Sequence, residues 1–190
     1  MTSIAEAYWG YLIYRTVYTE ESDRWLDTIL QRIGPYVRRA ILEDTHHESE
    51  LRFAFPLIQD KEELEDASLQ QLRERWNGQD RHHYPPTFFR NSVFLVLDEG
   101  SLKSFVDFAD DDPSDPIATF IPYLKMVDGR FDLNDPDDVE ERQWNPRREA
   151  MNVAVQHLGR YESLDREYDM ISRAKINFIV NPTYGEIWVG

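Results

Sequence analysis

The hydrophobic pattern at the start of the chain predicts a strand followed by a helix. Aromatic and β-branched residues dominate residues 8–18, and both faces of this segment are largely apolar, which is typical of a central strand. Cap-forming and acidic residues at 19–22 predict the start of a helix, whose apolar stripe covers residues 25–33. We expect Gly34-Pro35 to break or kink this helix.

The same alternation of strands and helices continues through the rest of the chain. Residues 51–56 alternate like a strand, and Pro56 places its end at a sheet edge or in a turn. Residues 61–76 have the periodicity of a helix, and residues 88–97 form the strongest strand pattern. Further elements are expected as a helix from Ser101, a strand at 121–127, a helix at 158–168 and terminal strands at 176–180 and 186–189.

Residues 145–158 fit two interpretations. Asn145-Pro146 could cap and start a helix that Gly159 ends. Against this, Met151, Val153 and Val155 alternate with polar or small residues, which is strand spacing. We favour a strand at 150–156 and leave the helix open.

The order of elements, β-α-β-α-β-α-β-β-α-β, predicts an α+β fold. We expect a single sheet with helices packed on one face, in a ferredoxin-like βαβ arrangement. Residues 1–190 are expected to form a single α+β domain, with acidic loops near 109–117 and 132–143.

Charge and composition restrict the partners. The formal net charge is −15, and residues 98–141 hold 3 basic and 14 acidic groups, net −11. Such a field repels phosphate backbones and anionic lipid, so we expect no nucleic acid and no membrane as partner. The chain has no cysteine, no basic leader at its start and no uncharged run of roughly 18 residues, which favours the cytoplasm, with the nucleus left open.

No motif indicates a metal or cofactor. The pairs His46-His47 and His82-His83 follow no ligand spacing rule, even when combined with Glu48 or Asp80, and loop histidines are the simpler interpretation. The acidic run from Asp132 begins like a calcium loop but fails at Pro136. Glycine-rich phosphate-binding motifs and a nucleophile elbow are absent from the sequence, so we predict no cofactor and no metal.

One charged residue inside an apolar strand marks a candidate site. Arg15 must be paired, exposed at an edge or turned toward a cavity, and a structural ion pair with an acid is the simplest interpretation. The alternative is a polar pocket at the strand ends, where phenol and imidazole groups could act as acid and base. The residues of this candidate pocket are Tyr14, Arg15, Tyr18, His82, His83 and Arg90.

The segment Trp9-Gly10-Tyr11-Leu12-Ile13-Tyr14-Arg15-Thr16-Val17-Tyr18 carries a resemblance. It is similar to a first strand, W-G-aromatic-x-I-Y-R-T-x-Y, found in uncharacterised small intracellular proteins of filamentous fungi, where an amphipathic helix also follows. The segments 94–99 and 122–128 look similar to the same group. The resemblance implies a fungal, non-secreted protein and carries no assigned activity.

The sequence therefore supports two functional hypotheses. The first is an intracellular binding or protein-interaction domain, with a protein partner or a homodimer formed through the aromatic-rich sheet. The second is a cofactor-independent enzyme acting on a small organic molecule in the pocket near the first strand, whose catalytic residues the sequence leaves unknown. Whether the chain is an enzyme at all stays open at this stage.

Overall fold

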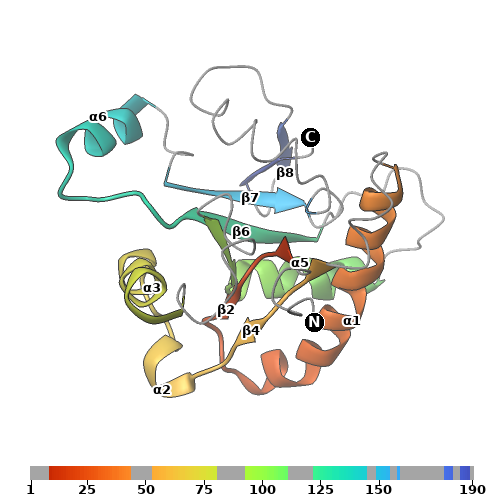
Figure 1. Ribbon diagram of the computed structural model, residues 1–190. Helices are drawn as coiled ribbons and strands as arrows, with labels where there is room; N and C mark the ends of the chain where they lie inside the picture. Colours follow the sequence, from red (N-terminus) through yellow and green to blue (C-terminus); the bar gives the residue numbers. More distant parts are fainter. Residues whose placement is uncertain are drawn as a thin grey trace, which may run out of the picture.

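The computed structural model describes residues 9–43, 53–80, 93–110, 122–144, 149–154, 158, 178–181 and 185–188. The strands are β1 (Trp9–Gly10), β2 (Ile13–Arg15), β3 (Phe53–Ala54), β4 (Leu57–Ile58), β5 (Val93–Leu97), β6 (Tyr123–Asp128), β7 (Ala150–Ala154), β8 (Phe178–Asn181) and β9 (Gly185–Trp188). The helices are α1 (Glu20–Glu43), α2 (Lys61–Leu64), α3 (Leu69–Arg75), the π-helical turn η3 (Trp76–Asp80), α5 (Glu99–Asp110) and α6 (Pro136–Trp144) (Figure 1).

The strands form a mixed sheet, as the sequence predicts for an α+β chain. Its order is β4-β2-β5-β6-β7-β9-β8, and β1 pairs separately with β3. Strand β2 runs parallel to both β4 and β5, whereas β5, β6 and β7 are antiparallel. This order does not confirm the ferredoxin-like arrangement. Strand β2, the first strand of the large sheet in the sequence, lies between two strands that both run parallel to it.

Pro56 explains why the edge of the sheet is divided, and Gly10 allows the close approach of β1 to β3. The Ile13 amide donates to the Pro56 carbonyl at 2.9 Å, so Pro56 faces β2. Proline has no amide hydrogen to return, so the ladder is interrupted there and β3 and β4 are separate strands. Gly10 has φ of +151°, and a Cβ on it would lie 1.9 Å from the Ala54 carbonyl oxygen.

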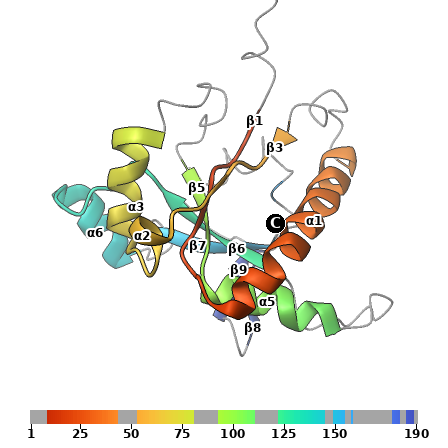
Figure 2. The same cartoon turned by 90° about the horizontal axis from the view of Figure 1, so that it is seen from below.

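The core covers both faces of the sheet, so the expectation of helices on one face is wrong. Ile13 and Leu95 pack in one apolar cluster with residues of α1 and α5. Their strand neighbours, including Tyr14 and Phe94, pack in a second cluster with α2, α3 and η3. In both views α1 and α5 lie on the opposite side of the sheet from α2 and α3 (Figures 1 and 2). The physical reason is that both faces of the central strands are apolar, and each needs a cover.

Two further expectations need correction. Helix α1 continues through Gly34-Pro35, so the pair does not break it, and a kink at the pair stays a prediction. Residues 136–144 form helix α6 rather than part of an acidic loop. The reason is local: the Asp137 amide donates to the Asp135 carboxylate at 3.0 Å, and Pro136 stands at the first helical position, where its fixed φ suits a helix.

Other expectations are confirmed or lie outside the described residues. Strand β7 confirms a strand rather than a helix over 150–154. The expected helix at 61–76 is present as α2 and α3, with a turn between them in which Asp66 has φ of 54°. The acidic segment 111–117 and most of the expected helix at 158–168 lie outside the described residues.

Candidate functional site

The structure separates the residues of the candidate pocket. Tyr14 and Arg15 are neighbours on β2 and therefore point to opposite faces, with Tyr14 in the cluster beneath α3 and Arg15 at the start of α1. His82, His83 and Arg90 lie outside the described residues. The described part of the chain therefore does not bring these side chains into one pocket.

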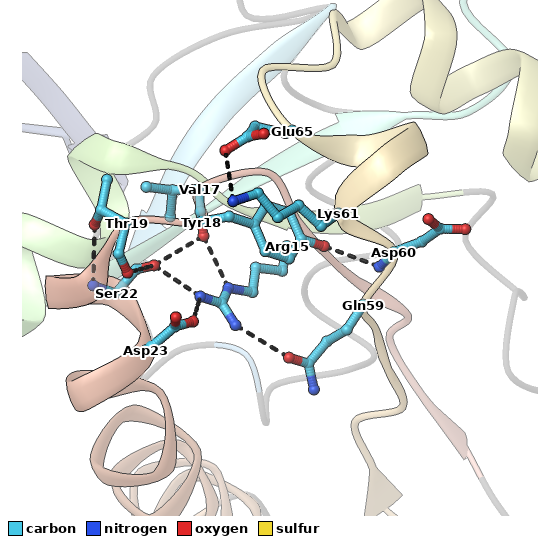
Figure 3. Close-up of polar contacts among 10 residues, drawn as sticks. All are labelled: Arg15, Val17, Tyr18, Thr19, Ser22, Asp23, Gln59, Asp60, Lys61 and Glu65. Carbon is cyan, nitrogen blue, oxygen red and sulfur yellow. Dashed lines mark hydrogen bonds and ion pairs between the residues drawn. The ribbon is translucent and has the colours of Figure 1, made fainter.

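Arg15 is held by internal contacts at the point where α1 begins (Figure 3). Its side chain is 4% exposed and forms an ion pair with Asp23 in the first turns of the helix. The guanidinium also donates to the Val17 carbonyl at 2.8 Å, to Ser22 Oγ at 2.7 Å and to Gln59 Oε1 at 3.1 Å. This confirms the structural ion pair and gives four of the five guanidinium N–H donors a partner.

Tyr18 joins the same site to the end of β4. The Arg15 guanidinium lies 4.5 Å from the centre of the Tyr18 ring, and the Asp60 amide donates to the Tyr18 hydroxyl at 2.9 Å (Figure 3). Burial raises the pKa of Tyr18, so its phenol is protonated at neutral pH. Arg15, Tyr18 and Asp60 thus fix the carboxyl ends of β2 and β4 against each other.

On the other face, Tyr14 belongs to a second internal network. Its hydroxyl donates to Asp80 Oδ2 at 2.8 Å, and Arg75 Nε donates to the same oxygen at 3.0 Å. Arg75 also pairs with Asp60 at 3.3 Å and with Glu63. The network ties α2 and η3 to the centre of β2, which is a structural role.

A group of polar side chains that the sequence did not single out lies on the same face as α2 and α3. Val96 stands opposite Lys125, and Lys125 stands opposite Asn152, so these side chains share one face of β5, β6 and β7. Asp98 follows Val96 by two residues and Tyr123 precedes Lys125 by two, which keeps both on that face. We call Asp98, Tyr123, Lys125 and Asn152 the polar row.

An ion pair forms the centre of the polar row. Lys125 Nζ donates to Asp98 Oδ2, with side chains 33% and 24% exposed. The second Asp98 oxygen accepts the Ser101 amide at 2.9 Å and so caps α5. Burial raises the pKa of Asp98, but the hydrogen bond and attraction from Lys125 and the bonds from Ser101 outweigh it, so the pKa lies below its usual value.

Tyr123 completes the polar row beside the first turn of α5. Its hydroxyl lies 2.6 Å from the point that a Cβ on Gly100 would occupy, and Asp98 Oδ1 lies 3.6 Å from the same point. Burial, followed by the charge of Asp98, raises the pKa of Tyr123 well above its usual value. Gly100 is therefore needed for the close approach of the phenol to the helix start.

The sequence holds a weak signal for the polar row. Lys125 interrupts an otherwise apolar strand pattern, whereas Asn152 stands at a polar position that alternates with Met151 and Val153. A charged residue at the position of Lys125 needs a partner. The partner could not be named from the sequence, because the register of β5 against β6 decides it. The polar row lies at the carboxyl ends of β2 and β5, where open sheets with parallel strands commonly bind ligands.

A comparison of the chain with known protein-family models, curated proteins and solved structures finds no match. Among the described residues, no helix is long and apolar enough to cross a membrane. The resemblance to fungal proteins stays a prediction.

Proposed function

We propose that this protein is a binding domain and that the polar row holds a small polar organic ligand. The observation that carries the proposal is that Asp98, just after β5, pairs with Lys125 of β6, and that Asn152 of β7 stands opposite Lys125 on the same sheet face. The rest of that face packs under α2 and α3 with apolar side chains. A few convergent polar groups beside an apolar wall are the usual composition of a small-molecule site.

Protonation states favour binding over acid–base catalysis at the polar row. Asp98 is ionised at neutral pH and already accepts hydrogen bonds from Lys125 and Ser101. Tyr123 stays protonated, because its pKa is raised. A general base needs a pKa near the working pH and an accessible lone pair, and neither group meets both conditions at pH 7.

The test is a fragment screen read by backbone amide chemical shifts. A ligand of the polar row should shift the amides of residues 123–126 and 150–154 and raise the apparent melting temperature. Asn152→Ala should weaken the shifts, whereas Asn134→Ala, a matched change at an exposed asparagine before α6, should leave them unchanged. Fragments that bind only elsewhere, or no binding fragment at all, would contradict the proposal.

The cofactor-independent enzyme is the second candidate, because the carboxyl ends of parallel strands are also where many α/β enzymes bind substrate. Turnover of a bound organic fragment would favour it over a binding domain. A protein partner, a homodimer and a cytoplasmic location remain predictions from the sequence. Sedimentation velocity over a concentration series measures the oligomeric state directly.

A further inference from the structure

The hydrogen-bonding capacity of the central ion pair is unequal. Lys125 has three N–H donors, and Asp98 is the only hydrogen-bond partner that the described residues give it. Asp98 already accepts hydrogen bonds from Lys125 and from the Ser101 amide, and the second bond caps the start of α5. Lys125 therefore keeps two N–H donors, whereas the bonds from Lys125 and from the backbone and side chain of Ser101 leave about one of the roughly four lone-pair sites of Asp98.

The exposure and the charge of the Lys125 ammonium decide which ligand can use its remaining N–H donors. The Lys125 side chain is 33% exposed, so its remaining donors are accessible from solvent while its stem is held on β6. A ligand ammonium would compete with Lys125 for Asp98 and would meet its positive charge. A ligand carboxylate would instead form charge-assisted hydrogen bonds with the ammonium.

The acidity of the whole chain does not oppose this choice strongly. Residues 98–141, which include Asp98 and Lys125, carry −11 of the net charge of −15, but charges in water are screened beyond about 8 Å at physiological ionic strength. Within the polar row the charges of Asp98 and Lys125 cancel. The number of unused donors on Lys125, compared with the unused acceptor sites on Asp98, then decides which ligand binds there.

We infer that the ligand of the polar row is a small organic acid whose carboxylate is received by Lys125. The inference rests on the proposed function and deepens it. Asp98 holds the ammonium in place before the ligand arrives and remains its partner afterwards, because a second carboxylate needs only the unused donors. The same arrangement limits affinity, since the ligand carboxylate is placed near Asp98.

The experiment uses fragments that occur as matched carboxylate, primary amide and amine, for example benzoate, benzamide and benzylamine. Each is titrated into the full chain, and dissociation constants are taken from amide shifts of residues 123–126 and 150–154. The carboxylate should bind more tightly than its amide and amine by about tenfold, the typical effect of one charge-assisted hydrogen bond.

Two substitutions should act in opposite directions. Lys125→Met should remove the preference for the carboxylate, whereas Asp98→Asn should strengthen carboxylate binding several-fold. Asparagine keeps the cap on α5, so the helix start is preserved. The matched control is Lys103→Met, because Lys103 is an exposed lysine of α5 that pairs with Glu99 at 2.8 Å. If Lys125→Met does not fold, Lys125→Gln, which keeps a polar side chain without the charge, provides the comparison with Asp98→Asn.

The outcomes separate the inference from the proposed function. Amide or amine fragments that bind the polar row as tightly as the carboxylate would overturn the inference and leave the proposed function standing. The same holds if Asp98→Asn weakens carboxylate binding. If none of the three classes shifts the amides of the polar row, both fail. Carboxylate binding that responds equally to Lys103→Met and Lys125→Met reflects general charge and also overturns the inference.

Discussion

Arg15 allows a sharp test of what holds the carboxyl end of β2. Its guanidinium reaches Val17, Ser22, Asp23 and Gln59 at once, which only a planar fork with several donors can do. We expect Arg15→Met to lower the free energy of unfolding and Arg15→Lys to lower it by nearly as much. Lysine keeps the positive charge but lacks the planar set of donors, so we expect it to recover little of the lost free energy of unfolding.

The magnitude follows from the exposure of the partners. Hydrogen bonds to neutral acceptors contribute about 0.5–1.5 kcal/mol each, and a methionine in the same space recovers part of the sum by apolar burial. The loss leaves no orphaned partner: Asp23 is 66% exposed, and the Val17 carbonyl still accepts Ser22 Oγ at 3.0 Å. We therefore expect a loss of about 2–4 kcal/mol for Arg15→Met.

Asp23→Ala should cost less, about 1–2 kcal/mol, because the buried Arg15 guanidinium loses its acid partner but keeps its bonds to Val17, Ser22 and Gln59. The measurement is urea unfolding followed by tryptophan fluorescence and circular dichroism, with linear extrapolation. Arg24→Met, at an exposed arginine of the same helix, is the control and should stay within about 0.5 kcal/mol of wild type. The reasoning is refuted if Arg15→Lys keeps wild-type stability, or if Asp23→Ala costs as much as Arg15→Met.

Further predictions concern the backbone and pH. Gly10→Ala should destabilise the fold by about 3 kcal/mol or more, because Gly10 has a positive φ and its Cβ would meet the Ala54 carbonyl. Gly78→Ala should be tolerated, because a Cβ on Gly78 would have no neighbouring atom within 4 Å. The melting temperatures of the two variants provide the comparison. Pro35→Ala should raise the free energy of unfolding in urea by about 1–2 kcal/mol, because it supplies the missing amide in α1; no gain would contradict this. The lowered pKa of Asp98 stabilises the fold above the unfolded value of about 3.9. That contribution is lost as pH falls through the folded pKa, so Asp98→Asn should be less acid-sensitive in urea unfolding at a series of pH values; an equal acid dependence would count against it.

Sequence periodicity anticipates much of the fold where one pattern dominates. The apolar run that becomes β5 and the alternation that becomes β7 were identifiable, because burial imposes a period of two on strands. The buried positions Leu72 and Trp76 followed from helical spacing. Helix α6 was missed because its many acids suggested a solvated loop, although Asp135-Pro136 is a helix start signal.

The candidate site was less predictable, for a reason that lies in long-range pairing. A strand pattern shows which residues share a face but not which strand lies beside it. Arg15 was marked by its charge, and its ion pair was anticipated, yet its supposed companion Tyr14 necessarily points to the other face. The polar row depends on the register of Val96 against Lys125, which no local pattern specifies.

The proline at the sheet edge has a consequence for cooperativity. Pro56 interrupts the hydrogen-bond ladder at the point where the β1–β3 pair ends and the β2–β4 pair begins. We therefore expect the two pairs to open in separate steps. The Trp9–Gly10 end can detach while Ile13 remains bonded between β4 and β5. We therefore expect the Trp9–Gly10 corner of the sheet to open at lower free energy than the central strands, which native-state hydrogen exchange measures.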